Sequence, residues 1–91
     1  MTVLNETARA DFLSANPTWE LDGETISKTY VLADFNEAVG FVMRVALIAE
    51  VADHHPDIDI RWNKVTIALT THDAGGLTAK DTDLAEQMER F

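Results

Sequence analysis

Residues 50–81 read EVADHHPDIDIRWNKVTIALTTHDAGGLTAKD, and the hydrophobic pattern of this stretch decides the fold. Six apolar residues take every second position in two short runs: Ile58, Ile60 and Trp62, then Val65, Ile67 and Leu69. A period of two is typical of strands with one buried face. With Asn63-Lys64 as a two-residue turn, Trp62 faces Val65, Ile60 faces Ile67 and Ile58 faces Leu69. The stretch therefore predicts an antiparallel hairpin in this register.

All three histidines of the chain lie in the same stretch, at positions 54, 55 and 72. Pro56 disfavours helical dihedral angles at His55, so a helix before it must end near Asp53 and leave His54 and His55 at its exit. The predicted register places His55 opposite His72, with Cβ atoms roughly 4.5–5.5 Å apart if the strand pairing extends that far. Because imidazoles titrate near neutral pH, the three form a candidate acid/base site.

The segment before the histidines predicts a long helix over residues 35–53. Asp34, followed three residues later by Glu37, has the pattern of a capping box. Between residues 38 and 52 the only residues that are not apolar are Gly40, Arg44 and Glu50. A helix that is apolar on most sides must be buried on more than one side, so we predict a homodimer or homotetramer with this helix at an interface. The apolar run is too short for a membrane span.

The remaining segments predict a second hairpin and two further helices. Apolar residues at helical spacing near the N-terminus predict a short helix that ends at Asn16-Pro17. Asp22-Gly23 is a strong turn signal between strand-like runs at residues 19–21 and 24–32. Thr78 and Asp81 have the spacing of a capping box before a C-terminal helix, which makes Asp81 a helix-start residue rather than a catalyst.

The predicted elements follow the order α-β-β-α-β-β-α in a single domain over residues 1–91. Ninety-one residues suffice for one hydrophobic core. We therefore predict an α+β fold with a four-stranded antiparallel sheet and the helices packed on one of its faces.

Composition excludes several classes of protein. A net charge of −9 argues against nucleic-acid binding, since affinity for the phosphate backbone needs clustered Lys and Arg. The absence of cysteine excludes disulfides and thiolate chemistry. No apolar run at the N-terminus resembles a signal peptide or a membrane span, so we expect a soluble cytoplasmic protein without membrane association.

The spacing Glu50-x3-His54-His55-Pro56-x5-Trp62-x9-His72-x8-Asp81 resembles the signature of the pterin-4a-carbinolamine dehydratases. This family includes the dimerisation cofactor of a hepatocyte nuclear factor. The resemblance extends to three further segments: residues 41–47, 63–65 and 76–78. Trp62 departs from the family pattern, because many members have tyrosine there, but both residues supply an aromatic face.

The resemblance implies dehydration of a 4a-hydroxytetrahydropterin beside an aromatic amino acid hydroxylase, without a metal or organic cofactor. It implies that His54 and His72 are the acid/base pair and that His55 chiefly binds and orients the pterin. It also implies that the three histidines share the substrate pocket with Pro56, Thr71, Asp73, Ala74 and Trp19. Without the resemblance, Trp19 is more typical of core packing.

Other functions compete with this interpretation. Histidine and carboxylate side chains are metal ligands, but adjacent histidines such as His54 and His55 point in different directions. Asp53-His54-His55 also resembles the DHH phosphoesterases, whose further acidic motifs this chain lacks. Nucleophilic catalysis has little support, since the cluster contains no cysteine or serine. The alternative that stays open is a non-catalytic module of the same fold, which assists a transcription-factor dimer or the assembly of other proteins.

Overall fold

The computed structural model describes residues 2–91 and confirms the predicted fold class and element order. The regular elements are α1 (Glu6–Ala15), β1 (Glu20–Asp22), β2 (Thr25–Val31), α2 (Phe35–Ala52), β3 (Asp57–Arg61), β4 (Lys64–Leu69) and α3 (Ala79–Met88). A short 3-10 helix, η1 (His72–Ala74), is an addition to the prediction. Side-chain caps begin all three α-helices, from Asn5, Asp34 and Thr78, as expected for residues that satisfy the free N–H groups of a first helical turn.

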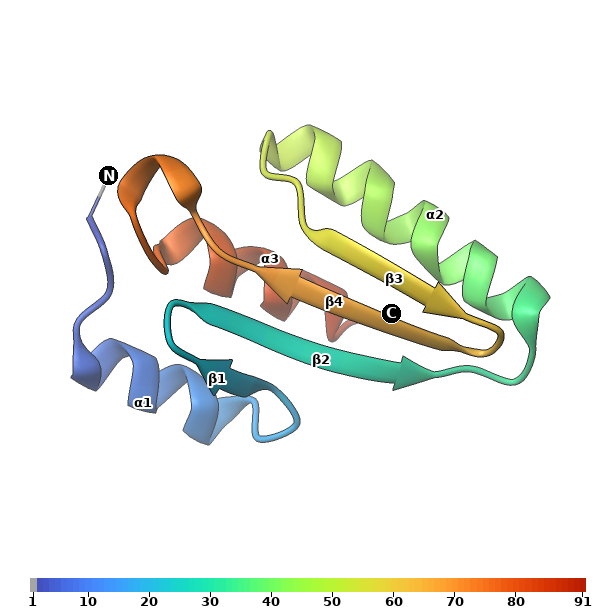
Figure 1. The fold of residues 1–91 in the computed structure, drawn as a ribbon, viewed down its shortest axis with the longest axis horizontal. Coiled ribbons are helices and arrows are strands. Elements are labelled where there is room, and N and C mark those ends of the chain that lie inside the picture. Colours follow the sequence, from blue (N-terminus) through green and yellow to red (C-terminus); the bar gives the residue numbers. More distant parts are fainter. Residues whose placement is uncertain (1) are drawn as a thin grey trace.

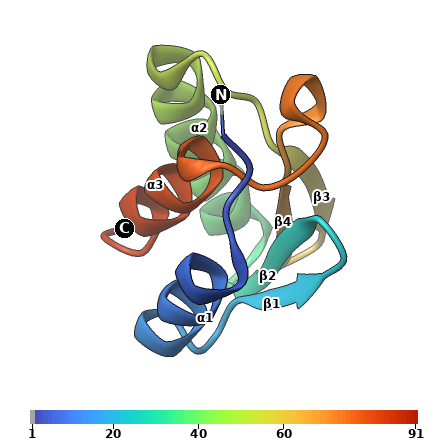
Figure 2. The same cartoon turned by 90° about the vertical axis from the view of Figure 1, so that its left-hand side faces the viewer.

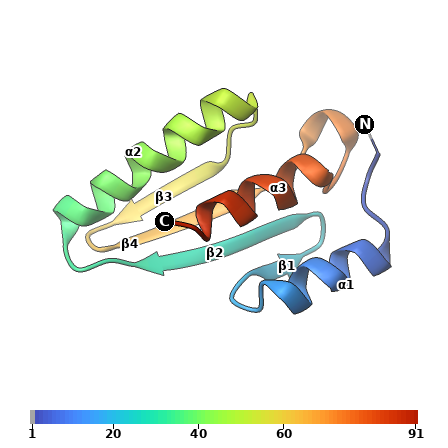
Figure 3. The same ribbon diagram turned by 180° about the vertical axis from the view of Figure 1, so that it is seen from behind.

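The four strands form one antiparallel sheet in the order β1-β2-β4-β3. The three α-helices lie on one face of this sheet and leave the other face uncovered (Figure 2). Seen from behind, α3 crosses the middle of the sheet between α1 and α2 (Figure 3). This arrangement confirms the predicted two layers and brings the C-terminal end of α2 near the segment after β4 (Figure 1).

The hydrophobic core lies between the sheet and the helices. Val65, Ile67 and Leu69 are buried at alternate positions of β4, as the period-two pattern predicts, and Ile26 is buried on β2. They pack with one side of α2 and with α3 in a cluster that includes Ile26, Val65, Ile67, Leu69, Val45, Ala49, Leu84 and Met88. Full burial of an aliphatic side chain stabilises the fold by about 1.5–3 kcal/mol. The core therefore anchors α2 and β4, the two elements after which the histidines lie.

The register predicted for the β3–β4 hairpin is wrong by two residues. Ile60 pairs with Val65 and Ile58 with Ile67, so the turn consists of Trp62 and Asn63 rather than Asn63 and Lys64. A shift of two keeps the same side chains on one face of the sheet, so the hydrophobic pattern could not distinguish the two registers. The predicted half-burial of β3 is wrong, because all of its residues are exposed, Ile58 and Ile60 included. Trp62 takes a left-handed φ of 52° and is 67% exposed. It does not join the core.

A tertiary contact sets this turn. Asn63 donates from Nδ2 to the carbonyl of Leu32 at 3.0 Å, and its own carbonyl accepts from the N–H of Leu32 at 2.8 Å. The first hairpin is also displaced, because Asp22 pairs with Thr25 and the turn consists of Gly23 and Glu24. Gly23 there has a φ of 61°, which glycine adopts without a steric penalty.

Candidate functional site

His54 and His55 follow a sharp turn at the end of α2. The chain reverses at Asp53, which has a left-handed φ of 51° and caps the helix. The N–H of His54 still donates to the carbonyl of Ala49 at 3.1 Å, so this histidine is tied to the last helical turn. Pro56 then leads into β3, as predicted from its effect on the preceding residue.

His72 comes from the other half of the site, at the start of η1 after β4. The end of α2 and the segment after β4 lie at the same end of the molecule (Figure 1). Between them is an open cavity of about 250 Å³, whose lining comprises Asp53, His54, His55, Thr70, Thr71, His72, Asp73 and Lys80. The structure thus brings together the three histidines, Thr71 and Asp73. It adds Lys80, Asp53 and Thr70 to the predicted set.

Three predicted pocket residues do not line this cavity. Pro56 and Ala74 are next to lining residues in sequence but are not part of the wall. Trp19 is 3% exposed in the hydrophobic core, where its ring packs edge-on against Phe12 and Tyr30.

The histidines meet through loops rather than through the strand pairing that the sequence predicted. β4 ends at Leu69, and the observed register, in which Asp57 pairs with Ala68, would bring Thr70 opposite His55 if it continued. The predicted opposition of His55 and His72 in a ladder is therefore wrong. The two residues share the cavity because η1 turns the chain toward the end of α2.

His54 is held by a buried carboxylate. Its side chain is largely buried, and Nε2 lies 2.5 Å from Oδ1 of Asp81, which is fully buried. The other oxygen of Asp81 accepts from Oγ1 of Thr71 at 2.8 Å and from the N–H of Thr78 at 3.0 Å. A carboxylate on one imidazole nitrogen sets the tautomer and the orientation of the ring. With Nε2 engaged, Nδ1 is the nitrogen left to exchange a proton with a ligand.

His55 and His72 are less constrained. Nε2 of His55 lies 2.7 Å from Oε1 of Glu50, and both side chains are exposed. An exposed pair of this kind contributes about 0–1 kcal/mol. Within residues 2–91 the side chain of His72 has no hydrogen-bond partner. Its position depends on the loop that carries it.

Asp81 is a further residue at the site that sequence reasoning missed. It was interpreted only as a helix-start residue, and the structure confirms that it forms a capping box with Thr78 at the start of α3. The same carboxyl group also contacts His54, so one residue has both roles. The signal was present, because Asp81 closes the spaced motif at His72-x8-Asp81, but a capping box explained it equally well.

Two other features bear on the kind of site. No group of three or more His, Cys, Asp or Glu side chains in the described part of the chain has an arrangement suited to a metal ion. No helix within residues 2–91 combines the length and apolar character needed to cross a membrane.

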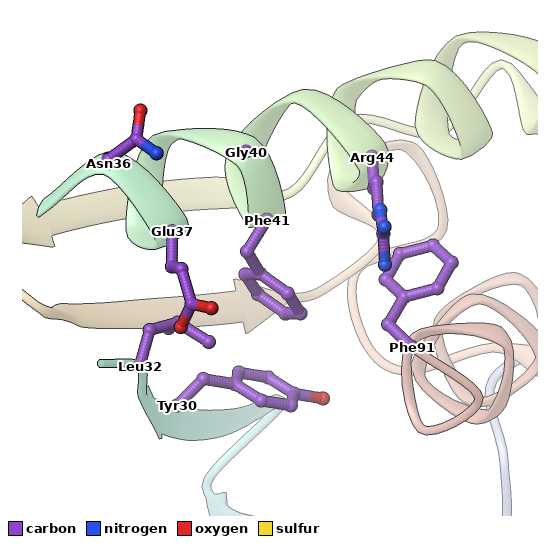
Figure 4. Close-up of a pocket in the computed structure, with 8 residues that line it drawn as sticks. All are labelled: Tyr30, Leu32, Asn36, Glu37, Gly40, Phe41, Arg44 and Phe91. Atoms are coloured by element: carbon purple, nitrogen blue, oxygen red, sulfur yellow. The ribbon is translucent and has the colours of Figure 1, made fainter. Parts of the chain in front are cut away.

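A larger cavity, of about 400 Å³, lies between the first half of α2, the end of β2 and Phe91. Its walls are mostly aromatic and charged, as Figure 4 shows: Tyr30, Phe41, Phe91, Glu37 and Arg44. No histidine lines it. We place the candidate site at the smaller cavity, because the groups able to transfer protons near neutral pH are gathered there.

Comparisons with known proteins show which proteins this chain resembles. Residues 2–91 match the family model described as pterin 4 alpha carbinolamine dehydratase. A protein from Chloroflexus aurantiacus, named "putative pterin-4-alpha-carbinolamine dehydratase", is 52% identical over 100% of this chain and 98% of its own. A relative of the same name from Roseiflexus sp. is 61% identical over 80% of this chain and 78% of its own.

Two solved structures share the fold. The crystal structure of a transcriptional coactivator/pterin dehydratase from Brucella melitensis has a TM-score of 0.92 and 35% identity, and the match covers 98% of this chain and 97% of that one. A pterin dehydratase-like protein identified as a RuBisCO assembly factor in the alpha-carboxysome has a TM-score of 0.68 and 18% identity, over 80% of this chain and 87% of that one. The second likeness concerns the fold alone.

Proposed function

The chain belongs to the pterin 4 alpha carbinolamine dehydratase family, and from this premise we propose that it removes water from a 4a-hydroxytetrahydropterin to release a quinonoid dihydropterin. The observation that carries the proposal is the convergence of His54, His55 and His72 on one cavity. A buried carboxylate holding one of the three imidazoles adds support, because a merely solvated histidine needs no such partner.

The reaction requires only proton transfer. The bond from C4a to the hydroxyl oxygen breaks as an acid protonates that oxygen, and water leaves. A base removes the proton from N5, and the electron pair of the N–H bond becomes the new C4a–N5 double bond. Imidazoles with an ordinary pKa of about 6.5 can act in either direction near neutral pH, and each well-placed group contributes roughly 10²–10⁴ in rate.

We assign the proton transfers to His54 and His72 and the orientation of the ring to His55. Asp81 holds the His54 ring in one orientation, which suits a group that must gain and return a proton in each turnover. His72 is exposed on a different segment of the cavity wall, so the two imidazoles can address different atoms of one flat ring. Asp73 offers a carboxylate to its polar edges.

The proposal includes a homo-oligomer. Large apolar side chains recur at every fourth position on the outer side of α2 and are exposed: Phe35, Val39, Met43, Leu47 and Val51. A row with this spacing is the ridge that packs in the commonest class of helix pairs. The same row could serve a different partner if the protein were a non-catalytic module. An aromatic amino acid hydroxylase is the class of enzyme that would supply the carbinolamine.

The test is a direct assay of the purified protein with a 4a-hydroxytetrahydropterin formed in the cuvette. We expect loss of the carbinolamine to be faster than the spontaneous reaction in proportion to protein concentration, and we expect His54→Ala/His72→Ala to abolish the acceleration. A folded wild-type protein that leaves the spontaneous rate unchanged would remove the enzymatic proposal and favour the binding module.

A further inference from the structure

The loop over residues 70–77 carries His72 between β4 and α3. His54 has Asp81 and His55 has Glu50 as a partner, whereas the exposed side chain of His72 has none within residues 2–91. The backbone of this loop must therefore determine where the His72 imidazole lies.

The loop is closed on itself by backbone hydrogen bonds. Thr71 and Gly76 form an isolated antiparallel bridge with N···O distances of 3.3 and 3.2 Å. Inside it, Gly75 has a left-handed φ of 79° and donates its N–H to the carbonyl of His72 at 3.0 Å. A shift at either end of the loop is transmitted to His72 through these short connections.

Glu24, in the turn between β1 and β2, contacts both ends of this loop. Its backbone carbonyl accepts from Oγ1 of Thr70 at 2.6 Å. Its carboxylate oxygen Oε1 accepts from the N–H of Leu77 at 3.2 Å. Glu24, which belongs to the β1–β2 hairpin, therefore contacts the loop at both its first and its last residue.

Arg9 of α1 holds that carboxylate. Nη2 lies 2.6 Å from Oε1 and Nη1 lies 2.9 Å from Oε2, a two-point contact that fixes direction as well as distance. The same guanidinium donates from Nε to the carbonyl of Leu4 at 2.9 Å, and the N–H of Leu4 donates to the carbonyl of Leu77 at 2.7 Å. Arg9, Glu24, Leu77 and Leu4 are therefore joined in a ring of hydrogen bonds.

Gly76 provides an independent indication. It is buried, and a Cβ atom at this position would collide with the carboxylate of Glu24. Its φ is not in the left-handed region, so backbone conformation does not explain the glycine. The space is needed for the Glu24 carboxylate to reach the N–H of Leu77.

We infer that Glu24, fixed by Arg9, is a positioning residue that sets the location of His72 in the active site. The inference rests on the proposed function for its catalytic consequence, and no substrate contact is assigned to Glu24. The Glu24 carboxylate is about half exposed, with 48% of its side chain accessible, so we expect its removal to lower global stability only modestly and to act mainly on the reaction.

The first test compares Glu24→Ala, Glu24→Gln and Glu89→Ala. Misplacement of a reacting group is costly, so we expect Glu24→Ala to lower kcat about tenfold. Glu24→Gln keeps an acceptor for the N–H of Leu77 and should recover most of the rate. Glu89→Ala is the matched control, because it removes a carboxylate that Lys28 contacts at 2.8 Å away from the loop, and it should leave kcat unchanged.

The second test repeats Glu24→Ala in the His72→Ala background. If Glu24 acts through His72, the substitution causes no further loss once the imidazole is gone. The same loss in both backgrounds would show a general structural effect and overturn the inference. So would an unchanged kcat for Glu24→Ala with His72 present.

A third measurement does not depend on activity. Amide hydrogen exchange at Gly76 and Leu77 should become faster in Glu24→Ala and stay near wild type in Glu89→Ala. If the wild-type protein proves inactive, the proposed function fails while this measurement still decides whether Glu24 holds the loop. Unchanged exchange at both amides would overturn the inference whatever the assay shows.

Discussion

Nε2 of His54, the second residue after α2, lies 2.5 Å from Oδ1 of Asp81, in the first turn of α3. The contact joins a cavity-lining imidazole to a carboxylate with no exposed surface. That carboxylate also accepts from Thr71, next to His72. Asp81 therefore links the two segments that carry the histidines.

Replacing Asp81 with asparagine should reduce catalysis more than stability. The amide oxygen of Asp81→Asn can still accept from the N–H of Thr78, but the side chain no longer presents a carboxylate oxygen to Nε2 of His54. We expect kcat to fall about 10–100-fold, the usual cost of losing the partner that orients a functional histidine. Stopped-flow assays beside thermal unfolding measure the two effects. An unchanged kcat in a folded variant would limit Asp81 to helix capping.

The three histidines should differ in kinetic signature. Groups that transfer protons act mainly on the transition state, whereas a group that orients the ring also binds the ground state. We expect His54→Ala and His72→Ala to lower kcat and His55→Ala to raise KM. Steady-state kinetics on the single variants and on the His54/His72 double variant check this division. Loss of turnover in His55→Ala with KM unchanged, together with a near-normal double variant, would contradict it.

A charge in the exposed apolar row of α2 should dissociate the oligomer. Leu47 is 65% exposed, and Leu47→Glu would bury a carboxylate in an apolar interface. We expect wild type to be a dimer or tetramer by light scattering at micromolar concentration and Leu47→Glu to be a monomer. Val31→Glu is the matched control, because Val31 is 66% exposed on β2. A monomeric wild-type protein would disprove this assignment.

Stability should decrease in acid, because two glutamates have lowered pKa values in the folded state. The hydrogen bond from Arg9 is the main cause for Glu24. Partial burial raises the pKa of Glu89, but hydrogen bonds from Lys28 and Tyr30 and the charge of Lys28 outweigh it and lower the pKa overall. A lowered folded pKa gives stability that is present above the ordinary value of 4.5 and lost as the pH falls through the folded value.

Denaturant unfolding between pH 7 and pH 3 measures this effect. The free energy of unfolding should drop more steeply below pH 4.5 in wild type than in the double variant Glu24→Gln/Glu89→Gln. Identical slopes would show that these two carboxylates do not contribute to the acid transition.

Metal removal should leave activity unchanged. The proposed reaction needs only proton transfer, and the adjacent histidines are poorly spaced as ligands of one ion. We expect exhaustive dialysis against a chelator to preserve kcat. Lost activity that zinc or manganese restored would replace the acid/base site with a metal site.

Local sequence patterns were sufficient for much of the architecture. The alternation in residues 58–69 predicted two strands, because every second side chain of a strand lies on the same face whatever its partner. The Asp34–Glu37 pair and the Thr78–Asp81 pair predicted the starts of α2 and α3, since capping depends on neighbours in sequence. Pro56 located the exit of α2 for the same reason, and the spaced histidine motif identified the three imidazoles of the cavity.

Tertiary contacts decided the rest, because they depend on residues that are far apart in sequence. The contact between Asn63 and Leu32 set the turn of the β3–β4 hairpin. The alternation pattern could not predict this turn, because it is the same in two registers that differ by two residues. The packing of Phe12 and Tyr30 against Trp19 places this residue in the core, as its residue type indicated and the family resemblance did not. The second role of Asp81 arises only where α3 lies beside the end of α2, which no spacing along the chain specifies.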